Sequence, residues 1–448
     1  MRSNVSGTLC PGSSRVQATS LWRNPDFLKF WAGRTVSLFG DEVSTLALPL
    51  VAITTLYASA GEMGVLAATG RAPIVVVGLL AGVWVDRVRR RPLLVGADLG
   101  RALLLGSIPV AASLSLLTLP VLYAVSSAVA TLGLLHGVAS GSYLPALVAR
   151  TALVDGNSKL VQSRSVAGVA GPGLAGVAIQ LLTAPGALVL DAWSFVVSAI
   201  CICLIGQREL PTTLPPAPPG GKTQPQPRPG VWHDIGEGLR AVWKDRFQRA
   251  PAGAIATYNL FFNVIATVYV LYLTRELGMG PAALSVLLAL YAVGGLGGSL
   301  VAARVGRNIG VGPVMVVGIA ASGAKNLVGA ITLHVAETPA TAFAVVAAVS
   351  LLRGVMGPFY GINQLSLQQA ITPDQIRGRV NATIQFVVGC TGLLDALAGG
   401  VLGEAIGLLP AITVGAAGTL LAVPWLFFSE LRRLRELPAS SQVEQERK

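Results

Sequence analysis

Apolar runs of about 20 residues recur along the whole 448-residue chain, and they constrain its fold more than any other feature. A helix of that length crosses a hydrocarbon core of ~30 Å. Charged residues make up only 12% of the chain, against roughly 25% in an average soluble protein. The sequence therefore predicts an all-α polytopic membrane protein and excludes an ordinary soluble fold.

Charged or Pro/Gly-rich breaks divide the apolar runs into twelve expected membrane spans. Because twelve is an even number, both termini are expected on the same side. The spans cover about residues 30–56, 62–85, 92–116, 120–139, 163–182, 186–208, 251–273, 282–303, 312–333, 338–360, 380–402 and 409–428.

The basic residues indicate which side that is. With the N-terminus in the cytoplasm, 27 of the 33 lysines and arginines fall in cytoplasmic segments, as expected for short loops that stay on the positive side. The net charge of +12 therefore reflects topology, and we expect no nucleic-acid partner. The first 20 residues lack the apolar core of a signal peptide.

A proline-rich stretch divides the chain into two halves of six spans. Its central part runs from Pro211 to Pro229 and predicts an extended linker. Residues 233–247 have the periodicity of an amphipathic helix at the membrane surface. Weak internal similarity, with residues 160–176 over 383–399, predicts two parallel six-helix repeats around a substrate cavity. The expected organisation is a cytoplasmic tail (1–28), a first half (29–210), the linker and amphipathic helix (211–250), a second half (251–429) and a second cytoplasmic tail (430–448).

The loop after the second span carries a recognisable motif. It reads Gly82-Val-Trp-Val-Asp86-Arg87-Val-Arg89-Arg90-Arg91. The motif resembles the G-x-x-x-D-R-x-G-R-R loop signature of the major facilitator superfamily, with Arg89 in place of the second glycine. Gly82 permits close helix packing, and Asp86 can pair with guanidinium groups and hold one conformational state. The alternative is that the arginines only anchor the loop in the cytoplasm. The candidate latch comprises Gly82, Asp86, Arg87, Arg90, Arg91 and Asp98.

Other passages are similar to one branch of that superfamily, the drug:proton antiporters that include macrolide-efflux and siderophore-export proteins. The resemblance covers about residues 22 to 435. The passages are Asn24-Pro-Asp-Phe, Gly40-Asp41, Ala47-Leu-Pro, Arg71-Ala-Pro, Asp98-Leu-Gly-Arg101, Asp191-Ala-Trp-Ser-Phe and Pro373-Asp-Gln-Ile-Arg-Gly-Arg379.

The fifth span carries a glycine and proline cluster, Gly171-Pro172-Gly173-Leu-Ala175-Gly176. It resembles the antiporter motif G-P-x-x-G-G of efflux members, with Ala175 in place of one glycine. Such a cluster predicts a flexible, closely packed bend that helps to seal the pore, for which Gly171, Pro172 and Gly176 are the candidate residues. Ordinary helix packing is the alternative.

Asp41 is the first candidate for proton coupling. It lies 11 residues past Phe30, which places it ~16 Å into the first span. The resemblance implies a carboxylate on this helix that exchanges protons, and an apolar setting disfavours the charged form of such a group. Glu42 points about 100° away on the same helix and is the second candidate. The alternative for Asp41 is a permanently ionised partner of Arg34, Arg71 or Arg101.

Further ionisable and polar side chains within the spans are candidates for lining the substrate cavity. Asp98 and Arg101 are three residues apart and can form a local ion pair. Asn259 and Asn263 share a helix face beside two aromatic residues, with simple interhelical hydrogen bonding as the alternative. The candidates are Arg101, Asn259, Asn263, Lys325, Arg353 and Asp395.

For three of these charges, all in the second half, the sequence suggests a partner or a role. Asp395 and Lys325 lie at similar depths, so a pair between them is conceivable. A binding role for Lys325 or Arg353 would suit an anionic or zwitterionic substrate. In the first half, His136 is expected to be buried and neutral.

The remaining chemistry is sparse. The four cysteines and three histidines show no metal-ligand spacing, and there is no Walker A sequence or catalytic constellation. We therefore expect no metal, no cofactor and no enzymatic activity. The expected partners are the lipid bilayer, a small-molecule substrate and protons, and we expect a monomer.

The resemblance implies a transporter in a bacterial inner membrane. We expect it to export a small amphipathic antibiotic, siderophore or other secondary metabolite by proton antiport with alternating access. The alternatives are a facilitator or proton-coupled importer of a small metabolite and, in another class, a non-transporting receptor or scaffold.

Overall fold

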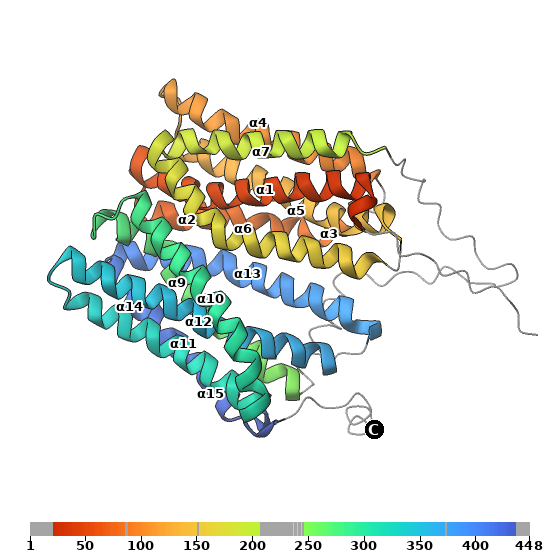
Figure 1. Ribbon diagram of the computed structural model, residues 1–448. Coiled ribbons are helices and arrows are strands. Elements are labelled where there is room, and N and C mark those ends of the chain that lie inside the picture. Colours follow the sequence, from red (N-terminus) through yellow and green to blue (C-terminus); the bar gives the residue numbers. More distant parts are fainter. Residues whose placement is uncertain are drawn as a thin grey trace, which may run out of the picture.

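A computed structural model describes residues 21–85, 88–149, 152–206, 246–371 and 374–435, together with positions 236, 240 and 243. Every regular element in these ranges is a helix (Figure 1). Asp86, Arg87, the proline-rich stretch and most of the expected amphipathic helix lie outside these described residues, and so do the predictions made for them.

The first half contains seven α-helices that make six crossings. Helix α1 continues through a π-helical turn, Val51–Thr55, and Val77 divides the second crossing into α2 and α3. The Val77 amide donates to the carbonyl oxygen of Pro73, 2.8 Å away. The helices are α1 (Pro25–Leu50), α2 (Ala60–Val76), α3 (Gly78–Val85), α4 (Arg90–Ser113), α5 (Leu119–Leu147), α6 (Leu153–Leu182) and α7 (Ala184–Cys203).

The second half repeats this arrangement. Its last crossing, Leu408–Phe427, comprises α14, a short 3-10 turn and α15. The helices are α9 (Arg246–Arg275), α10 (Pro281–Ile309), α11 (Val311–His334), α12 (Pro339–Ile371), α13 (Asp374–Ile406), α14 (Leu408–Thr419) and α15 (Val423–Phe427). Eleven described helices are long and apolar enough to cross a membrane, and α2 with α3 makes the twelfth crossing. The predicted all-α membrane fold is confirmed.

Several helices are longer than the apolar runs that predict them. Helix α5 continues to Leu147, α6 begins at Leu153 and α12 continues to Ile371. These extra turns lie at the linker end, which we define as the end where α7 stops and α9 starts; the opposite end is the far end. A helix satisfies its own backbone hydrogen bonds, so it can extend beyond the hydrocarbon, whereas hydropathy detects only the apolar part.

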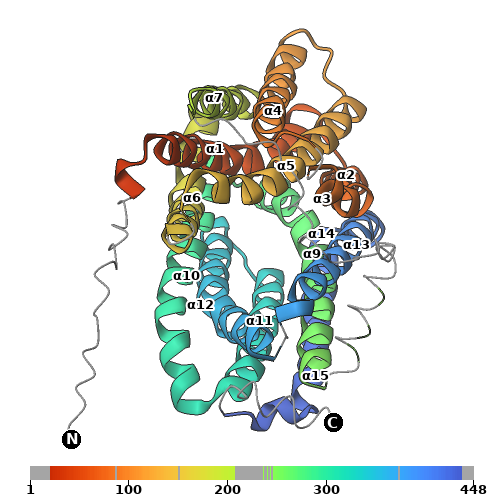
Figure 2. The same cartoon turned by 90° about the vertical axis from the view of Figure 1, so that its right-hand side faces the viewer.

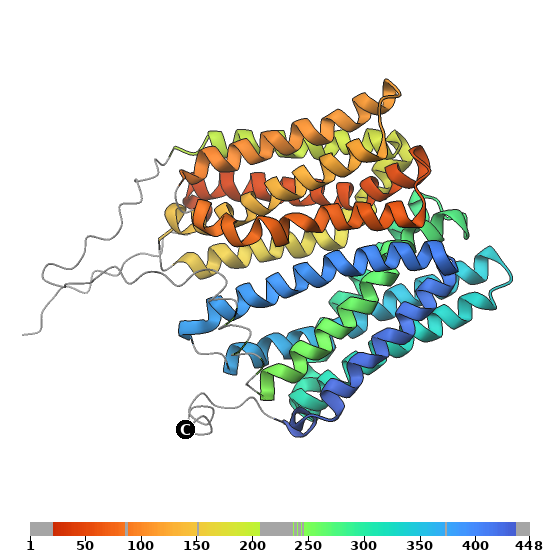
Figure 3. The ribbon, with the colours of Figure 1, turned by 180° about the vertical axis from the view of Figure 1, so that it is seen from behind.

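The two halves meet along two seams. Helix α2 packs against α13, and α6 packs against α10 (Figure 2). Seen from behind, α13 runs beside α2 (Figure 3). In Figures 1 and 3 the ribbons of the two halves lie closest at the far end and diverge toward the linker end.

The buried apolar side chains follow the same division. One continuous core at the far end includes Val51 and Leu105 of the first half together with Val268 and Leu287 of the second. At the linker end each half has a separate core, which includes Tyr143 in the first half and Met315 and Tyr360 in the second. Among the described residues, a core shared by both halves therefore closes the far end, and no such shared core lies at the linker end.

Backbone contact and a helix cap hold the far end together. A Cβ atom on Gly64 of α2 would lie 2.8 Å from the carbonyl oxygen of Ala396 on α13. Beside this contact, the Oε2 atom of Glu404 on α13 accepts a hydrogen bond of 2.9 Å from the Gly61 amide in the first turn of α2. A carboxylate is favourable at a helix N-terminus, so α13 caps α2 across the seam.

Candidate transport site

Asp41 lies beside a buried guanidinium. Its Oδ1 atom is 3.7 Å from Nη1 of Arg101 on α4. The Asp41 side chain is 42% exposed, whereas that of Arg101 is 4% exposed. Of the three partners considered for Asp41, the structure places Arg101 within ion-pair distance. The carboxylate thus combines an accessible position with a buried positive partner.

The same arginine joins Asp41 to a second, fully buried carboxylate. Arg101 forms an ion pair with Asp98, which confirms the predicted local pair. His136 of α5 is buried as predicted, and its Nε2 atom lies 3.4 Å from Asp98. The guanidinium also lies over the ring of Phe195 on α7, 3.9 Å from its centroid. Helices α1, α4, α5 and α7 therefore converge on one charged cluster.

Asp191 is a buried carboxylate that the site prediction missed. It is 0% exposed, and its two oxygens accept hydrogen bonds from Ser44 of α1 and from Ser194. Within the described ranges no Lys or Arg lies within 4.0 Å of it. The signal was present in the sequence, because an acidic residue inside the apolar run of α7 is costly in the same way as Asp41.

Asp41 and Glu42 face different helices, as their angular separation predicts. Whereas Asp41 lies near α4, Glu42 packs against α6, where a Cβ atom on Gly171 would lie 2.6 Å from its Cγ atom. A side chain at position 171 would therefore displace Glu42.

Gly171 and Gly176 of the antiporter-like motif lie against different helices. A Cβ atom on Gly176 would lie 1.4 Å from the Oγ atom of Ser285 on α10, across the second seam. Helix α6 is continuous through the buried Pro172, so the expected bend does not interrupt the helix. The motif brings α6 close to α1 within its half and close to α10 in the other half.

A polar network crosses between the halves from α2. Arg71 donates to the carbonyl oxygen of Gly392 (3.0 Å) and to the side-chain oxygen of Asn263 (3.2 Å). The Nδ2 atom of Asn263 donates to Asp395, 3.1 Å away. Asn263 therefore takes part in interhelical hydrogen bonding, the alternative considered for it. Arg71, a possible partner of Asp41, instead binds the second half.

The suggested pair between Asp395 and Lys325 is wrong. The Lys325 ammonium donates to the Oδ1 atom of Asn326 (2.7 Å), while Asp395 accepts from Asn263. Helix α13 packs against α2, α9 and α14, whereas α11 packs mainly against α12 and α14. Similar depth in the membrane therefore did not bring these two charges together.

Arg353, the other candidate cation of the second half, lies beside aromatic side chains. The rings of Tyr258 and Phe262 are stacked, with centroids 5.8 Å apart. The Arg353 guanidinium lies 4.2 Å from the Phe262 centroid and 4.8 Å from that of Tyr291. Asn259 is half-buried on the same helix as Phe262. These residues give the second half an aromatic and cationic lining that contrasts with the carboxylates of the first.

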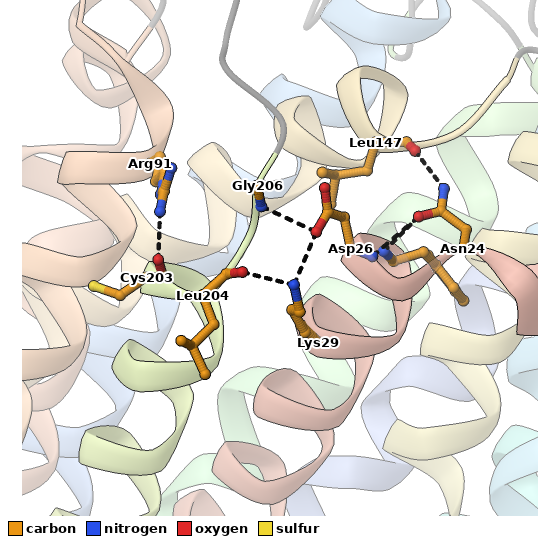
Figure 4. Close-up of polar contacts among 9 residues, drawn as sticks. Asn24, Asp26, Lys29, Arg91, Leu147, Cys203, Leu204 and Gly206 are labelled. Carbon is orange, nitrogen blue, oxygen red and sulfur yellow. Dashed lines mark hydrogen bonds and ion pairs between the residues drawn. The ribbon is translucent and has the colours of Figure 1, made fainter.

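The loop signature is described only in part. Gly82 lies in α3. Arg91 donates to the carbonyl oxygen of Cys203 at the end of α7 (Figure 4). In the same view Lys29 bridges Asp26 and the Leu204 carbonyl oxygen. These bonds join elements of the first half to one another, while the proposed latch role of Arg90 and its neighbours stays a prediction.

Comparisons with known proteins agree with this architecture. The family model of the Major Facilitator Superfamily matches residues 251–448. The multidrug efflux pump Tap of Mycolicibacterium fortuitum is 26% identical over 446 residues, which cover 94% of this chain and 99% of Tap. The uncharacterized MFS-type transporter YfiS of Bacillus subtilis (strain 168) is 26% identical over 413 residues, which cover 88% of this chain and 91% of YfiS.

Solved structures share the fold. A bacterial homologue of the iron transporter ferroportin, 19% identical in its inward-facing state, superposes with a TM-score of 0.64 over 91% of this chain and 99% of its own. An outward-facing structure of a bacterial ferroportin homologue, 18% identical, gives a TM-score of 0.54 over 90% of this chain and 98% of its own. With twelve crossings in two six-helix halves, the chain has the fold of major facilitator superfamily transporters and is similar in sequence to two transporters over most of its length, which indicates a transport protein.

Proposed function

We propose that this transporter exports a small amphipathic molecule in exchange for protons. The observation that carries the proposal is the cluster in which Arg101 lies between the exposed carboxylate of Asp41 and the buried carboxylate of Asp98. The resemblance to the efflux pump Tap supports export. An antibiotic, a siderophore or another secondary metabolite would be the cargo.

The proposed cycle alternates access between the two ends. The far end is closed by a core that both halves share, and the linker end has a separate core in each half. The distribution of basic residues supports a linker end that lies in the cytoplasm, in a bacterial inner membrane with both termini inside. The TM-score is higher to an inward-facing structure of a bacterial ferroportin homologue (0.64) than to an outward-facing one (0.54), which supports this assignment.

Proton exchange at Asp41 would drive the cycle. An ionised Asp41 is attracted by Arg101, and a proton on Asp41 removes that attraction. Asp98 keeps Arg101 in place in both cases, because it is buried in direct contact with the guanidinium. Deprotonation of Asp41 accompanies substrate loading, while the protonated form disfavours substrate and promotes the return step. Glu42 is the second candidate for the exchanging group.

The test uses energised everted membrane vesicles and a pH-sensitive dye, to which a panel of antibiotics and siderophores is added. Wild type is compared with Asp41→Asn and with the matched control Asp155→Asn, an exposed carboxylate in the first turn of α6. We expect compound-dependent proton release from wild type and the control, and none from Asp41→Asn.

Two results would contradict the proposal. Compound movement without proton release from any of the three proteins, with all present in the membrane, would favour a facilitator over an antiporter. Equal proton release from Asp41→Asn and wild type would keep antiport and move the coupling group to another residue.

A further inference from the structure

Two cations of the second half, Lys325 and Arg353, have no acidic partner among the described residues. Lys325 is 8% exposed, and the hydrogen bond of its ammonium goes to the neutral amide of Asn326. Arg353 contacts two aromatic rings. Within the ranges that the structure describes, no carboxylate lies within 4.0 Å of either group. Asn326, which accepts from Lys325, lines the same cavity as Arg353, so the region holds two positive charges.

In the first half, by contrast, two cations within the membrane lie close to carboxylates or are linked to them through hydrogen bonds. Arg101 has two carboxylate partners, and the Arg71 network ends at Asp395. Burial of a cation without a counter-ion is costly, because hydration is lost and no attraction replaces it. Two like charges near one another increase that cost. Their retention in one place points to an anion that arrives from outside the chain.

A cavity lies beside Arg353 and beside Asn326, the residue to which Lys325 donates. It is lined by residues of α9, α11, α12 and α14, with a volume of about 60 Å3. Polar side chains of Asn326, Ser350 and Arg353 reach its wall, together with the rings of Phe262 and Tyr269. One water molecule occupies about 30 Å3 of liquid, so the cavity fits a charged group of a few atoms. A whole drug-sized molecule needs roughly 300 Å3 or more.

We propose that this cavity binds the anionic group of the transported molecule, a carboxylate, sulfonate or phosphate on an apolar body. Arg353 and Asn326 would donate hydrogen bonds to the anion, and Lys325, which binds Asn326, would add its charge. The guanidinium fork matches the geometry of such oxyanions. The stacked Tyr258 and Phe262 would contact the apolar body. This inference rests on the proposed function, since it names the substrate class of the exporter.

The test measures binding to the purified full-length protein in lipid nanodiscs, without a pH gradient. The probes are 2-naphthylacetate and its neutral amide, which share the same apolar body, and the readout is the probe-dependent shift in Tm. We expect the acid to raise the Tm of wild type and the amide to have little effect. Lys325→Met and Arg353→Gln should each weaken the response to the acid about tenfold in concentration.

A matched control and a second measurement keep the test decisive. Arg275→Gln removes an exposed cation at the far end and should respond as wild type does. Without any probe, Lys325→Met should raise the Tm, because it removes a buried charge that has no counter-ion. Equal effects of acid and amide on wild type, including no effect of either, would overturn the proposal. Because no transport is measured, failure of proton exchange in vesicles would leave this result unaffected.

Discussion

The far end and the linker end of this transporter are built from the same twelve crossings but are held together differently. At the far end one apolar core includes both halves, and α13 contacts and caps α2. At the linker end the apolar cores are separate, and the polar contacts of Figure 4 join α1, α4, α5 and α7 within the first half.

This difference indicates which contacts must break during the conformational change. Opening the far end must separate packed backbone and apolar surface, whereas the ties at the linker end of the first half can persist because they do not cross between the halves. Substitutions at the far end should therefore change the balance between states. Substitutions in the linker-end ties should change the stability of one half without changing that balance.

The largest expected effect comes from Gly64→Leu. In this structure, with its far end closed, a Cβ atom here would lie 2.8 Å from the Ala396 carbonyl oxygen, and overpacking of this kind costs about 1–3 kcal/mol. The population should shift toward the far-end-open state by about five- to 150-fold. Spin labels at Leu116 and Glu337, in a cysteine-free background, would report a longer distance.

The control for this prediction is Gly96→Leu. A Cβ atom on Gly96 meets no other group within 4 Å, so the label distance should stay that of wild type. An unchanged distance in Gly64→Leu would show that the glycine contact does not hold the far end closed.

Arg71→Gln should have a smaller effect in the same direction. The substitution removes a charged donor that binds the Gly392 carbonyl oxygen and Asn263 across the seam. Hydrogen bonds to charged groups contribute about 1.5 kcal/mol or more, so the shift should be about tenfold in population. The label distance at the far end measures it, with Arg275→Gln as the matched control. A shift of equal size in both variants would point to a general effect of lost charge.

Local features of this molecule could be predicted from sequence, and distant ones could not. The crossings follow from runs of apolar residues, and the Asp98–Arg101 pair follows from a spacing of three on one helix. The network from Arg71 to Asn263 and Asp395 joins residues 192 and 132 positions apart. Depth within a span is readable from sequence, but the neighbouring helix that a side chain faces is not, which explains the wrong pair between Lys325 and Asp395.

Asn24→Ala should lower the stability of the first half and leave the balance between states unchanged. The Asn24 side chain caps α1 by accepting from the amides of Asp26 and Phe27, and it donates to the Leu147 carbonyl oxygen at the end of α5 (Figure 4). Loss of such a cap costs about 1 kcal/mol, so the Tm should fall. Both residues belong to the first half, so the far-end label distance should not change.

Asn24→Asp separates the two roles of this side chain. Aspartate still accepts from the helix amides but cannot donate to Leu147, so its Tm should lie between those of wild type and Asn24→Ala. A far-end distance that changes in either variant would mean that the linker-end ties act on both halves. The contrast between the two ends would then fail, because a contact made within one half would be controlling the closure between them.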